Sequence, residues 1–397
     1  MGKLSSVLSF LNSIMPKKKR ILFNSFSDVS GNSLVLYDYI VNEREDLSSE
    51  YDLVWTVSDI SVEQAKEILR NRTGVDSHKC YTKKSIGGIF RFLTSKYIVS
   101  THGYFSQVKT PAKQTHINLW HGMPFKRIGR LIDEEVHSNG KSDEADKTIA
   151  TSPVFKEIMA KAFGINEESV AMTGQPCNDD LLKSTDALMK LGVVPNLYNK
   201  VIAWLPTYRK SVVGDIRLDG NENSFGVVDV LQNNFDELDA FLKEKEFLLV
   251  IKPHPMDAVC NMSLPQSDNI KVVLNHELSE KYIQLYELLH DCDVLLTDYS
   301  SVFIDFLVTN KPMAFVCDDI DEYGGSRGFT FDNPRDLMPG EVISSFDELK
   351  NYLNNIDSFE EKWRDRYQTV KKKLNPYDTI CGCKNVCDAF FEPQNSI

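Results

Sequence analysis

Three observations predict that this chain folds as two doubly wound α/β domains that face each other across a cleft. Its 397 residues are more than one hydrophobic core usually serves. Short apolar runs alternate with helical patterns, a rhythm that is typical of parallel sheets. The rhythm stops at Val193–Asn199, which is rich in Pro and Asn, and then starts again. We therefore expect an N-terminal domain over 21–195, a C-terminal domain over 196–375 and a closing helix over 376–397.

In the first half, apolar runs predict six strands, and helical spacing predicts helices between some of them. The strands are expected at Ile21–Phe26, Tyr51–Val57, Tyr97–Ser100, Ile117–Trp120, Thr148–Thr151 and Val170–Thr173. Helices are expected at Asn32–Asn42 and Ser61–Arg70.

The second half repeats this pattern. Strands are expected at Val201–Leu205, Phe247–Ile251, Ile270–Leu274, Val294–Thr297 and Met313–Val316. Helices are expected at Phe235–Lys245, Tyr282–His290 and Val302–Val308, and then at Asp347–Leu353, Glu360–Lys373 and Asp378–Phe391.

The first 20 residues have a character of their own. Apolar residues recur at helical spacing from Leu4 to Met15, and the basic run Lys17–Arg20 follows directly. An apolar stripe joined to a basic run is typical of a segment that lies on an anionic membrane surface. The alternative is a helix that docks on the protein's own surface. No stretch is apolar enough to span a membrane.

Composition limits the possible functions. Hydrophobic residues make up 42% of the chain and charged residues 26%, values that are typical of a globular protein. The formal net charge of -12 argues against a general nucleic-acid binder, which would carry a basic face. Scattered cysteines indicate reduced thiols in the cytoplasm. The cluster Cys381, Cys383 and Cys387 lacks a fourth ligand for zinc, so buried thiols are the favoured interpretation.

Four segments place reactive side chains at predicted strand ends, which is where open α/β sheets bind ligands. In the first, a strand runs into His121 and Gly122, and Lys126 follows. Histidine accepts a proton from a hydroxyl near neutral pH, whereas the structural alternative is a buried histidine with internal partners. In the second segment, Thr207 and Arg209 follow a strand, and a guanidinium matches the geometry of a phosphate.

The third and fourth segments belong to the second half. Lys252 and His254 follow an apolar strand and are separated by a proline. Asp298 ends another buried strand, and Ser300 and Ser301 open the next helix. A helix N-terminus favours phosphate, although a serine there also serves as an ordinary cap. Together the segments indicate a phosphorylated ligand. The acidic run at 318–321 leaves a divalent metal open.

The order Trp-His-Gly-x-Pro-x-Lys, Pro-Thr-x-Arg, Lys-Pro-His-Pro and Thr-Asp-Tyr-Ser-Ser resembles the CDP-glycerol glycerophosphotransferase family of teichoic acid and capsule synthesis. The similarity extends from about Lys19 to Phe390. It implies a GT-B-like fold and the transfer of glycerol phosphate from CDP-glycerol to a hydroxyl of a lipid-linked or polymeric acceptor, with release of CMP. The resemblance also implies that the protein acts at the inner face of the cell membrane. No cofactor is implied.

The resemblance also implies roles for individual residues. His121 would be the general base, and His254 would stabilise charge on the donor phosphates. Arg209, Thr207, Lys252, Asp298, Ser300 and Ser301 would bind or orient the donor, and Gly122 and Lys126 would support the site. One departure is Cys177, which stands where the family commonly has arginine.

Several alternatives stay open at this point. CDP-ribitol is a rival donor, and a glycosyltransferase that uses a nucleotide sugar is a rival enzyme class. A binding or scaffold protein that has kept the fold is a third class. A single-unit primase and a polymerase both fit the chain.

Overall fold

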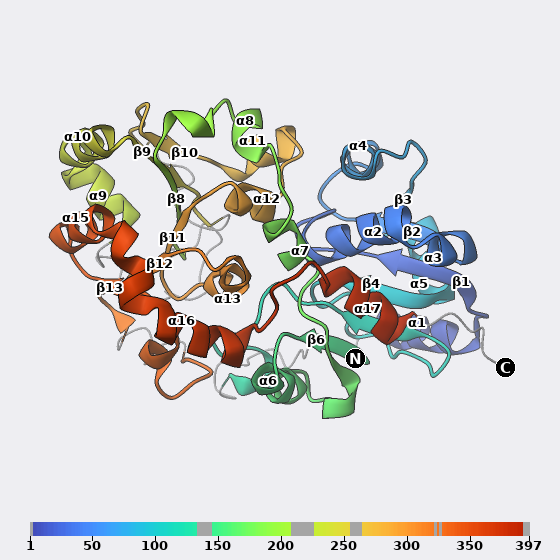
Figure 1. The fold of residues 1–397 in the computed structure, drawn as a ribbon. Helices are drawn as coiled ribbons and strands as arrows, with labels where there is room; N and C mark the ends of the chain where they lie inside the picture. The colour runs from blue at the N-terminus through green and yellow to red at the C-terminus, as the bar shows by residue number, and fades with distance from the viewer. Residues whose placement is uncertain are drawn as a thin grey trace. The chain divides into compact units, whose positions relative to one another are not determined.

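The computed structural model describes residues 3–132, 145–207, 226–254, 264–320, 324 and 328–391, and the chain divides into two compact units. The N-terminal unit comprises Met1–Met123, Ile128–Asp180 and Thr379–Ile397, and the C-terminal unit comprises Pro124–Arg127 and Leu181–Asp378. The sequence analysis expected the division near 195. It lies nearer 180, and the last helix, α17 (Gly382–Phe390), packs on α2 (Gly31–Glu43) of the N-terminal unit (Figure 1).

The N-terminal unit contains a parallel sheet with the strand order β3-β2-β1-β4-β5-β6-β7. Its strands are β1 (Lys18–Phe23), β2 (Asp52–Val57), β3 (Lys79–Thr82), β4 (Ser95–Ser100), β5 (Thr115–Asn118), β6 (Lys147–Ala150) and β7 (Val170–Met172). Its longer helices besides α2 and α17 are α1 (Lys3–Ile14), α4 (Val62–Thr73), α5 (Ile86–Thr94) and α6 (Pro153–Phe163), and the short helices are α3 (Glu45–Glu50) and α7 (Asn178–Leu181).

The C-terminal unit repeats this topology with a parallel sheet in the order β10-β9-β8-β11-β12-β13. Its strands are β8 (Lys200–Leu205), β9 (Phe247–Ile251), β10 (Ile270–Val272), β11 (Val294–Thr297), β12 (Met313–Val316) and β13 (Glu341–Ile343). Its helices are α8 (Ala187–Lys190), α9 (Val227–Asn233), α10 (Phe235–Lys245), α11 (Asn275–Glu280), α12 (Leu285–His290), α13 (Val302–Phe306), α15 (Phe346–Asn354) and α16 (Phe359–Leu374).

The central strands are buried along their whole length. Every residue of β9, β11 and β12 is buried, as expected for a parallel sheet that has helices on both faces. The predicted fold class of two doubly wound units is therefore confirmed. The sequence analysis missed β3 and β13 because both are short edge strands with polar residues.

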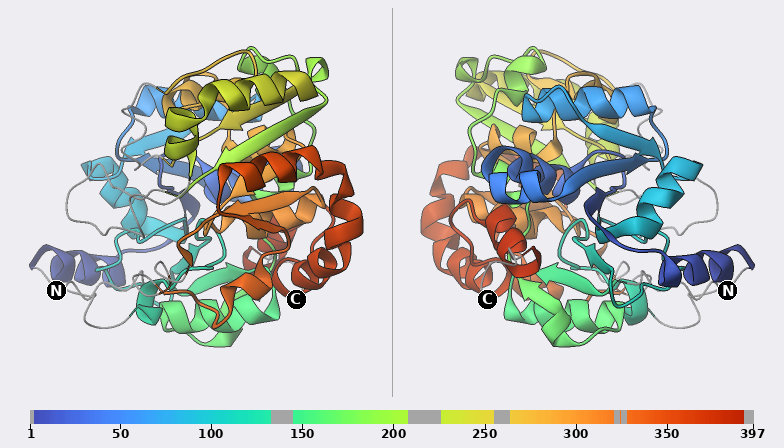
Figure 2. Two further views of the ribbon diagram at one scale, coloured as in Figure 1. Left: turned by 90° about the vertical axis from the view of Figure 1, so that its left-hand side faces the viewer. Right: turned by 90° about the vertical axis from the view of Figure 1, so that its right-hand side faces the viewer.

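Helix α1 docks on the N-terminal unit through one face. Leu8, Leu11 and Met15 pack against a cluster of buried residues that includes Leu22 and Phe92. Asn12 is fully buried between them, and its side-chain amide donates to the Lys109 carbonyl oxygen at 3.1 Å and to Gln114 Oε1 at 2.8 Å. Leu4, Val7, Phe10 and Ile14 of α1, which lies at the edge of the unit in Figure 2, are apolar and exposed.

The basic run after α1 mostly makes contacts inside this unit. The Lys17 ammonium donates to the carbonyl oxygens of Asn12 and Leu93, and burial lowers its pKa to about 8. Lys19 pairs with Glu50, and the buried Arg20 pairs with Asp52. Three of the four cations therefore have partners within the unit, through the docking of α1 and through β1. No helix of the described residues is long and apolar enough to cross a membrane.

The C-terminal cysteines lie where α17 joins the N-terminal unit. The Asp179 carboxylate accepts hydrogen bonds from the backbone N–H groups of Cys381, Gly382 and Cys383, and so it holds the first turn of α17. Burial raises the pKa of the Cys387 thiol to about 12 and also raises that of Cys383. Both are protonated thiols in the core. Within the described ranges, no group of three or more His, Cys, Asp or Glu side chains could hold a metal ion.

Candidate functional site

In each sheet the strand order reverses at one place, and the polar motifs lie at strand ends near that place. In the N-terminal sheet, β2 and β3 are added on one side of β1, whereas β4 to β7 are added on its other side. In the C-terminal sheet, β8 and β11 form the corresponding central pair. The loops that follow such a pair leave in opposite directions and open a crevice, which is the usual ligand site of doubly wound sheets. Each unit therefore has one topological switch point.

At the switch point of the C-terminal unit, a carboxylate joins the two central loops. Leu205 and Thr297 are register partners at the ends of β8 and β11. Beyond them, Asp298 Oδ2 accepts hydrogen bonds from the Thr207 backbone N–H at 2.9 Å and from its hydroxyl at 2.8 Å. Asp298 and Thr207 are both buried. This pair fixes the start of both loops, so Asp298 is placed to orient its neighbours rather than to touch a ligand.

Lys252 and His254 follow β9, which is the other neighbour of β8. Lys252 is buried, and its ammonium donates to the Pro253 carbonyl oxygen at 3.0 Å and to the Asn275 side-chain oxygen. Both of these acceptors are neutral oxygen atoms, and they fix the position of the Lys252 ammonium at the end of β9. His254 is half-buried, two residues further on. The structure thus brings Thr207, Lys252, His254 and Asp298 to one edge of one sheet.

Ser300 and Ser301 lie in the loop between β11 and α13. The Ser300 hydroxyl accepts from the Val302 backbone N–H at 3.4 Å, whereas the Ser301 hydroxyl makes no capping bond to α13. Between them and Asp298, the buried Tyr299 hydroxyl donates to Asp319 Oδ1 at 2.8 Å. Asp319, which belongs to the acidic run that had suggested a metal, therefore anchors this loop. Arg209 lies outside the described residues.

His121 lies at the carboxyl edge of the N-terminal sheet, after β5. Its ring stacks on Trp120 with centroids 4.2 Å apart, and its Nδ1 is 3.0 Å from the Thr101 carbonyl oxygen. A carbonyl oxygen can only accept, so Nδ1 carries a proton, and in the neutral ring Nε2 therefore has the lone pair. This is the tautomer that a general base needs. The backbone turns sharply here, with Trp120 at φ 53° and Gly122 at φ 140°.

Asn32 holds this turn in place. Its side-chain nitrogen donates to the carbonyl oxygens of Leu119 at 3.2 Å and Trp120 at 3.0 Å. Its side-chain oxygen accepts from the Cys177 backbone N–H at 2.9 Å. One buried amide therefore joins the loops that follow β1, β5 and β7. Cys177 itself is buried against this amide, so its side chain packs inside the unit.

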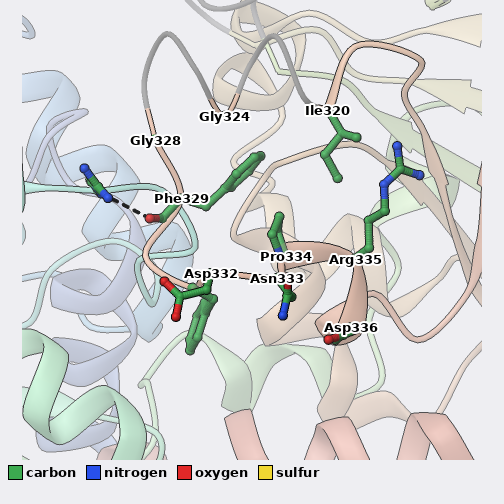
Figure 3. Close-up of a pocket in the computed structure, with 11 residues that line it drawn as sticks. Ile320, Gly324, Gly328, Phe329, Asp332, Asn333, Pro334, Arg335 and Asp336 are labelled. Carbon is green, nitrogen blue, oxygen red and sulfur yellow. Dashed lines mark hydrogen bonds between the residues drawn. The ribbon is translucent and has the colours of Figure 1, made fainter.

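The segment after His121 belongs to the C-terminal unit. Phe125 is fully buried there, against Phe303 and Phe329, and Lys126 forms an antiparallel bridge with Phe329. A pocket of about 700 Å³ opens beside this bridge (Figure 3). Arg127, Phe329, Phe331, Asn333 and Arg335 are among its lining residues. Phe329 also contacts Tyr299 at 5.5 Å between ring centroids, which connects the pocket to the loop after β11.

Sequence reasoning missed two side chains near His121. His102 follows β4 directly, and Lys83 follows β3. A single histidine or lysine at a loop carries no pattern, so only the position of the loop relative to the switch point could have indicated them.

Comparison with known families places this geometry in context. The model of the CDP-glycerol:poly(glycerophosphate) glycerophosphotransferase family matches residues 7–392. The chain belongs to this family. The predicted family and enzyme class are thereby confirmed.

Curated relatives of this glycerophosphotransferase act in teichoic acid synthesis. A teichoic acid glycerol-phosphate transferase of Staphylococcus aureus is 26% identical, with 96% of this chain and 95% of the relative covered. A teichoic acid glycerol-phosphate primase of Bacillus subtilis is 27% identical, with 91% of each covered. A teichoic acid poly(ribitol-phosphate) polymerase of Bacillus spizizenii is 28% identical over 86% of this chain, which spans 53% of that relative.

Solved structures show the same fold. The solved structure of the wall teichoic acid polymerase TagF superposes on this glycerophosphotransferase with a TM-score of 0.74 at 22% identity, covering 97% of this chain and 92% of the chain in that structure. A UDP-N-acetylglucosamine 2-epimerase of Neisseria meningitidis gives a TM-score of 0.51 at 12% identity, with 94% of this chain and 100% of the epimerase covered. Both likenesses show the fold, which is the predicted GT-B-like one.

Replacing Asn32 with alanine should remove the amide that holds the His121 turn. The Cys177 N–H and the Trp120 carbonyl would lose a buried partner, at a cost of roughly 1–3 kcal/mol. We expect a lower unfolding temperature and, at a temperature where the variant is folded, a turnover that falls at least about tenfold because His121 is less well oriented. Asn42→Ala, an exposed asparagine on the same helix, is the control. Turnover equal to that of the control would contradict this role.

Proposed function

We propose that this glycerophosphotransferase moves glycerol phosphate from CDP-glycerol to a hydroxyl group of a lipid-linked or polymeric acceptor of the teichoic acid type. Family membership supports the reaction class. The observation that carries the assignment of the donor side is the gathering of Thr207, Lys252, His254 and Asp298 at one edge of the C-terminal sheet, after β8, β9 and β11. A cation, an imidazole and a serine-lined loop at one sheet edge suit a pyrophosphate.

In this proposal the reaction is an in-line displacement at the phosphorus atom that bears the glycerol. The acceptor hydroxyl attacks this phosphorus, and the bond from phosphorus to the oxygen of the departing CMP breaks. His121 Nε2 takes the hydroxyl proton, since its Nδ1 is occupied by the Thr101 carbonyl. Charge develops on the oxygens of the transferred phosphoryl group and on CMP, where Lys252, His254 and the Ser300–Ser301 loop would stabilise it.

The pocket in the C-terminal unit offers room for the part of the donor that is not phosphate. Its volume is about 700 Å³, and aromatic, cationic and amide side chains line it. The cytosine base of the donor can stack on the rings of Phe329 and Phe331. Arg127 and Asn333 can donate hydrogen bonds to the carbonyl oxygen of this base. Lys126 and Gly122 act as supporting residues, through the bridge to Phe329 and through the turn at His121.

A donor screen tests the proposed reaction. The purified protein would be incubated with CDP-glycerol, CDP-ribitol or a UDP-sugar and a soluble acceptor, and nucleotide release and product mass would be measured. The proposal expects CMP release and a mass increase of one glycerol phosphate unit with CDP-glycerol. Preference for CDP-ribitol would assign the rival donor. Release of UDP or UMP would contradict the reaction class.

His121→Ala and His254→Ala should each lower turnover with CDP-glycerol by at least about 100-fold, the scale for loss of a general base or of a group that stabilises developing charge. The exposed His276 of α11 provides a matched control, and His276→Ala should keep turnover near the wild-type value. Circular dichroism would establish that the variants fold. A folded His121→Ala or His254→Ala enzyme with turnover near that of the control would remove that residue from the mechanism.

We also propose that the exposed face of α1 holds the enzyme at the inner surface of the cell membrane, where a lipid-linked acceptor would be found. Leu4 is 72% exposed, Phe10 63% and Ile14 60%. Ile86, at the start of the neighbouring α5, is 90% exposed. Lys18 lies over the Phe90 ring of α5 and supplies a cation at the edge of this apolar face. An amphipathic segment of this kind suits an interface.

Because α1 docks through Asn12 and β1 begins at Lys18, deleting residues 1–20 would damage the unit, and point substitutions are the better test. Changing Leu4, Phe10 and Ile14 to serine should lower co-sedimentation with anionic vesicles at least about tenfold, since each loses apolar area that the interface would bury. The control changes Met189, Val194 and Leu197, which are equally exposed elsewhere, to serine. Equal vesicle binding by the two triple variants would refute the membrane role of α1.

A further inference from the structure

The switch point of the N-terminal unit holds basic groups that the proposed mechanism has not used. The loops after β1 and β4 meet there, and the Phe26 backbone N–H donates to the Thr101 hydroxyl at 3.1 Å. His102 is the next residue, and its ring centroid is 6.0 Å from that of Phe26. Helix α2 begins at Gly31 on the same edge of the sheet, with its positive end toward the crevice.

Lys83 is a half-buried cation of this crevice. Its ammonium lies over the Tyr104 ring at 4.6 Å and over the Phe105 ring at 5.6 Å. Within the described ranges, Lys83 forms no ion pair with a carboxylate. Burial lowers its pKa, because the aromatic surroundings replace part of its hydration. A cation that is partly removed from water without a close anion favours the binding of one.

The two nearest acidic groups do not remove this charge. Asp28 and Asp59 lie near enough to favour the charged form of Lys83, but neither forms a salt bridge with it. The Asp28 carboxylate is occupied by the backbone N–H groups of Ser58, Asp59 and Ile60 at 2.7, 2.6 and 3.2 Å. Lys84, the other charged neighbour, is exposed.

His102 lies within the electrostatic reach of both Lys83 and His121. Burial, together with the positive charges of Lys83 and His121, lowers the pKa of His102 to about 4. Its Nδ1 is buried and has no hydrogen-bond partner among the described residues, so Nε2 is the nitrogen that remains for a ligand. The negative charge of a bound anion would offset the mutual repulsion of positive charge on Lys83, His102 and His121.

The same backbone carries His102 and fixes His121. His121 Nδ1 donates to the Thr101 carbonyl, which is the peptide group that joins Thr101 to His102. A ligand whose hydroxyl lies at His121 Nε2 is therefore also near His102, because the Thr101 carbonyl that orients the His121 ring precedes His102 directly. An anionic group that contacts His102 would therefore lie close to the attacking hydroxyl of the acceptor.

We propose that Lys83 and His102 form an acceptor-phosphate site, which binds the phosphodiester group one glycerol unit away from the hydroxyl that His121 deprotonates. The proposal rests on the proposed function, because it names the acceptor class of the same site. A growing glycerol phosphate chain carries this phosphodiester next to its terminal hydroxyl, whereas a neutral polyol or sugar acceptor does not. The site would thus favour an acceptor that already ends in a glycerol phosphate unit.

The test compares two soluble acceptors with the full-length enzyme and no vesicles present: an oligomer of glycerol phosphate and glycerol itself. Lys83→Met and His102→Asn should each raise KM for the oligomer at least about tenfold, as expected when a charge-assisted hydrogen bond is lost. Their effect on kcat/KM for glycerol should be at least about tenfold smaller than their effect on kcat/KM for the oligomer. Lys84→Met, which removes the exposed neighbouring charge, should leave both acceptors unaffected.

A direct binding measurement separates this proposal from the proposed function. Calorimetry with sn-glycerol 3-phosphate should show binding to the wild-type protein that Lys83→Met and His102→Asn weaken and Lys84→Met does not. Such binding would support the site even if CDP-glycerol proved not to be the donor. Equal loss with both acceptors would overturn the proposal, and so would loss of vesicle binding with an unchanged KM for the oligomer, which would assign the cluster to lipid headgroups.

Discussion

The strand order shared by the two sheets is the constraint on which the functional residues depend. The strand order reverses between β1 and β4 and between β8 and β11, so the loops after these pairs diverge, and the loops after the neighbouring strands β5 and β9 lie at the same carboxyl edges. The polar residues that matter chemically therefore occupy few positions, and they come from segments far apart in the sequence.

Each crevice is held in shape by one buried polar side chain. In the C-terminal unit, the Asp298 carboxylate binds both donor groups of Thr207 across β8 and β11. In the N-terminal unit, the Asn32 amide binds the turn before His121 and the loop after β7. Asn32 and Asp298 are both buried, and a buried polar group without a partner is costly in free energy. Their hydrogen bonds are therefore maintained. The Asn32 hydrogen bonds fix the backbone before His121, and so they help to orient the His121 ring.

Much of this arrangement could be predicted from the sequence. The apolar runs of β9, β11 and β12 stand out because these strands are buried on both faces, and their bounds were predicted to the residue. Motifs at strand ends pointed to Thr207, Lys252, His254 and Asp298, which the fold brings to one edge. The edge strands β3 and β13 were missed because half-exposed strands lack a continuous apolar run. His102 and Lys83 were missed because their significance depends on strand order, which periodicity does not reveal.

The N-terminal segment shows a different limit. Helical periodicity identified α1, but an apolar stripe cannot tell which of its residues face the protein. The structure divides the apolar residues of α1 into docked ones, Leu8, Leu11 and Met15, and exposed ones, Leu4, Phe10 and Ile14. Charge spacing was also insufficient, because Lys17 and Arg20 find partners that lie far away in the sequence.

The central claim is that the donor binds at the switch point of the C-terminal unit, and amide hydrogen exchange with and without CDP-glycerol tests it most directly. The account predicts slower exchange in the loops that follow β8, β9 and β11, including Thr207, His254 and Ser300–Ser301, with smaller changes around His121. Protection confined to the N-terminal loops around Asn32 and His121, with none after β8 and β11, would contradict it.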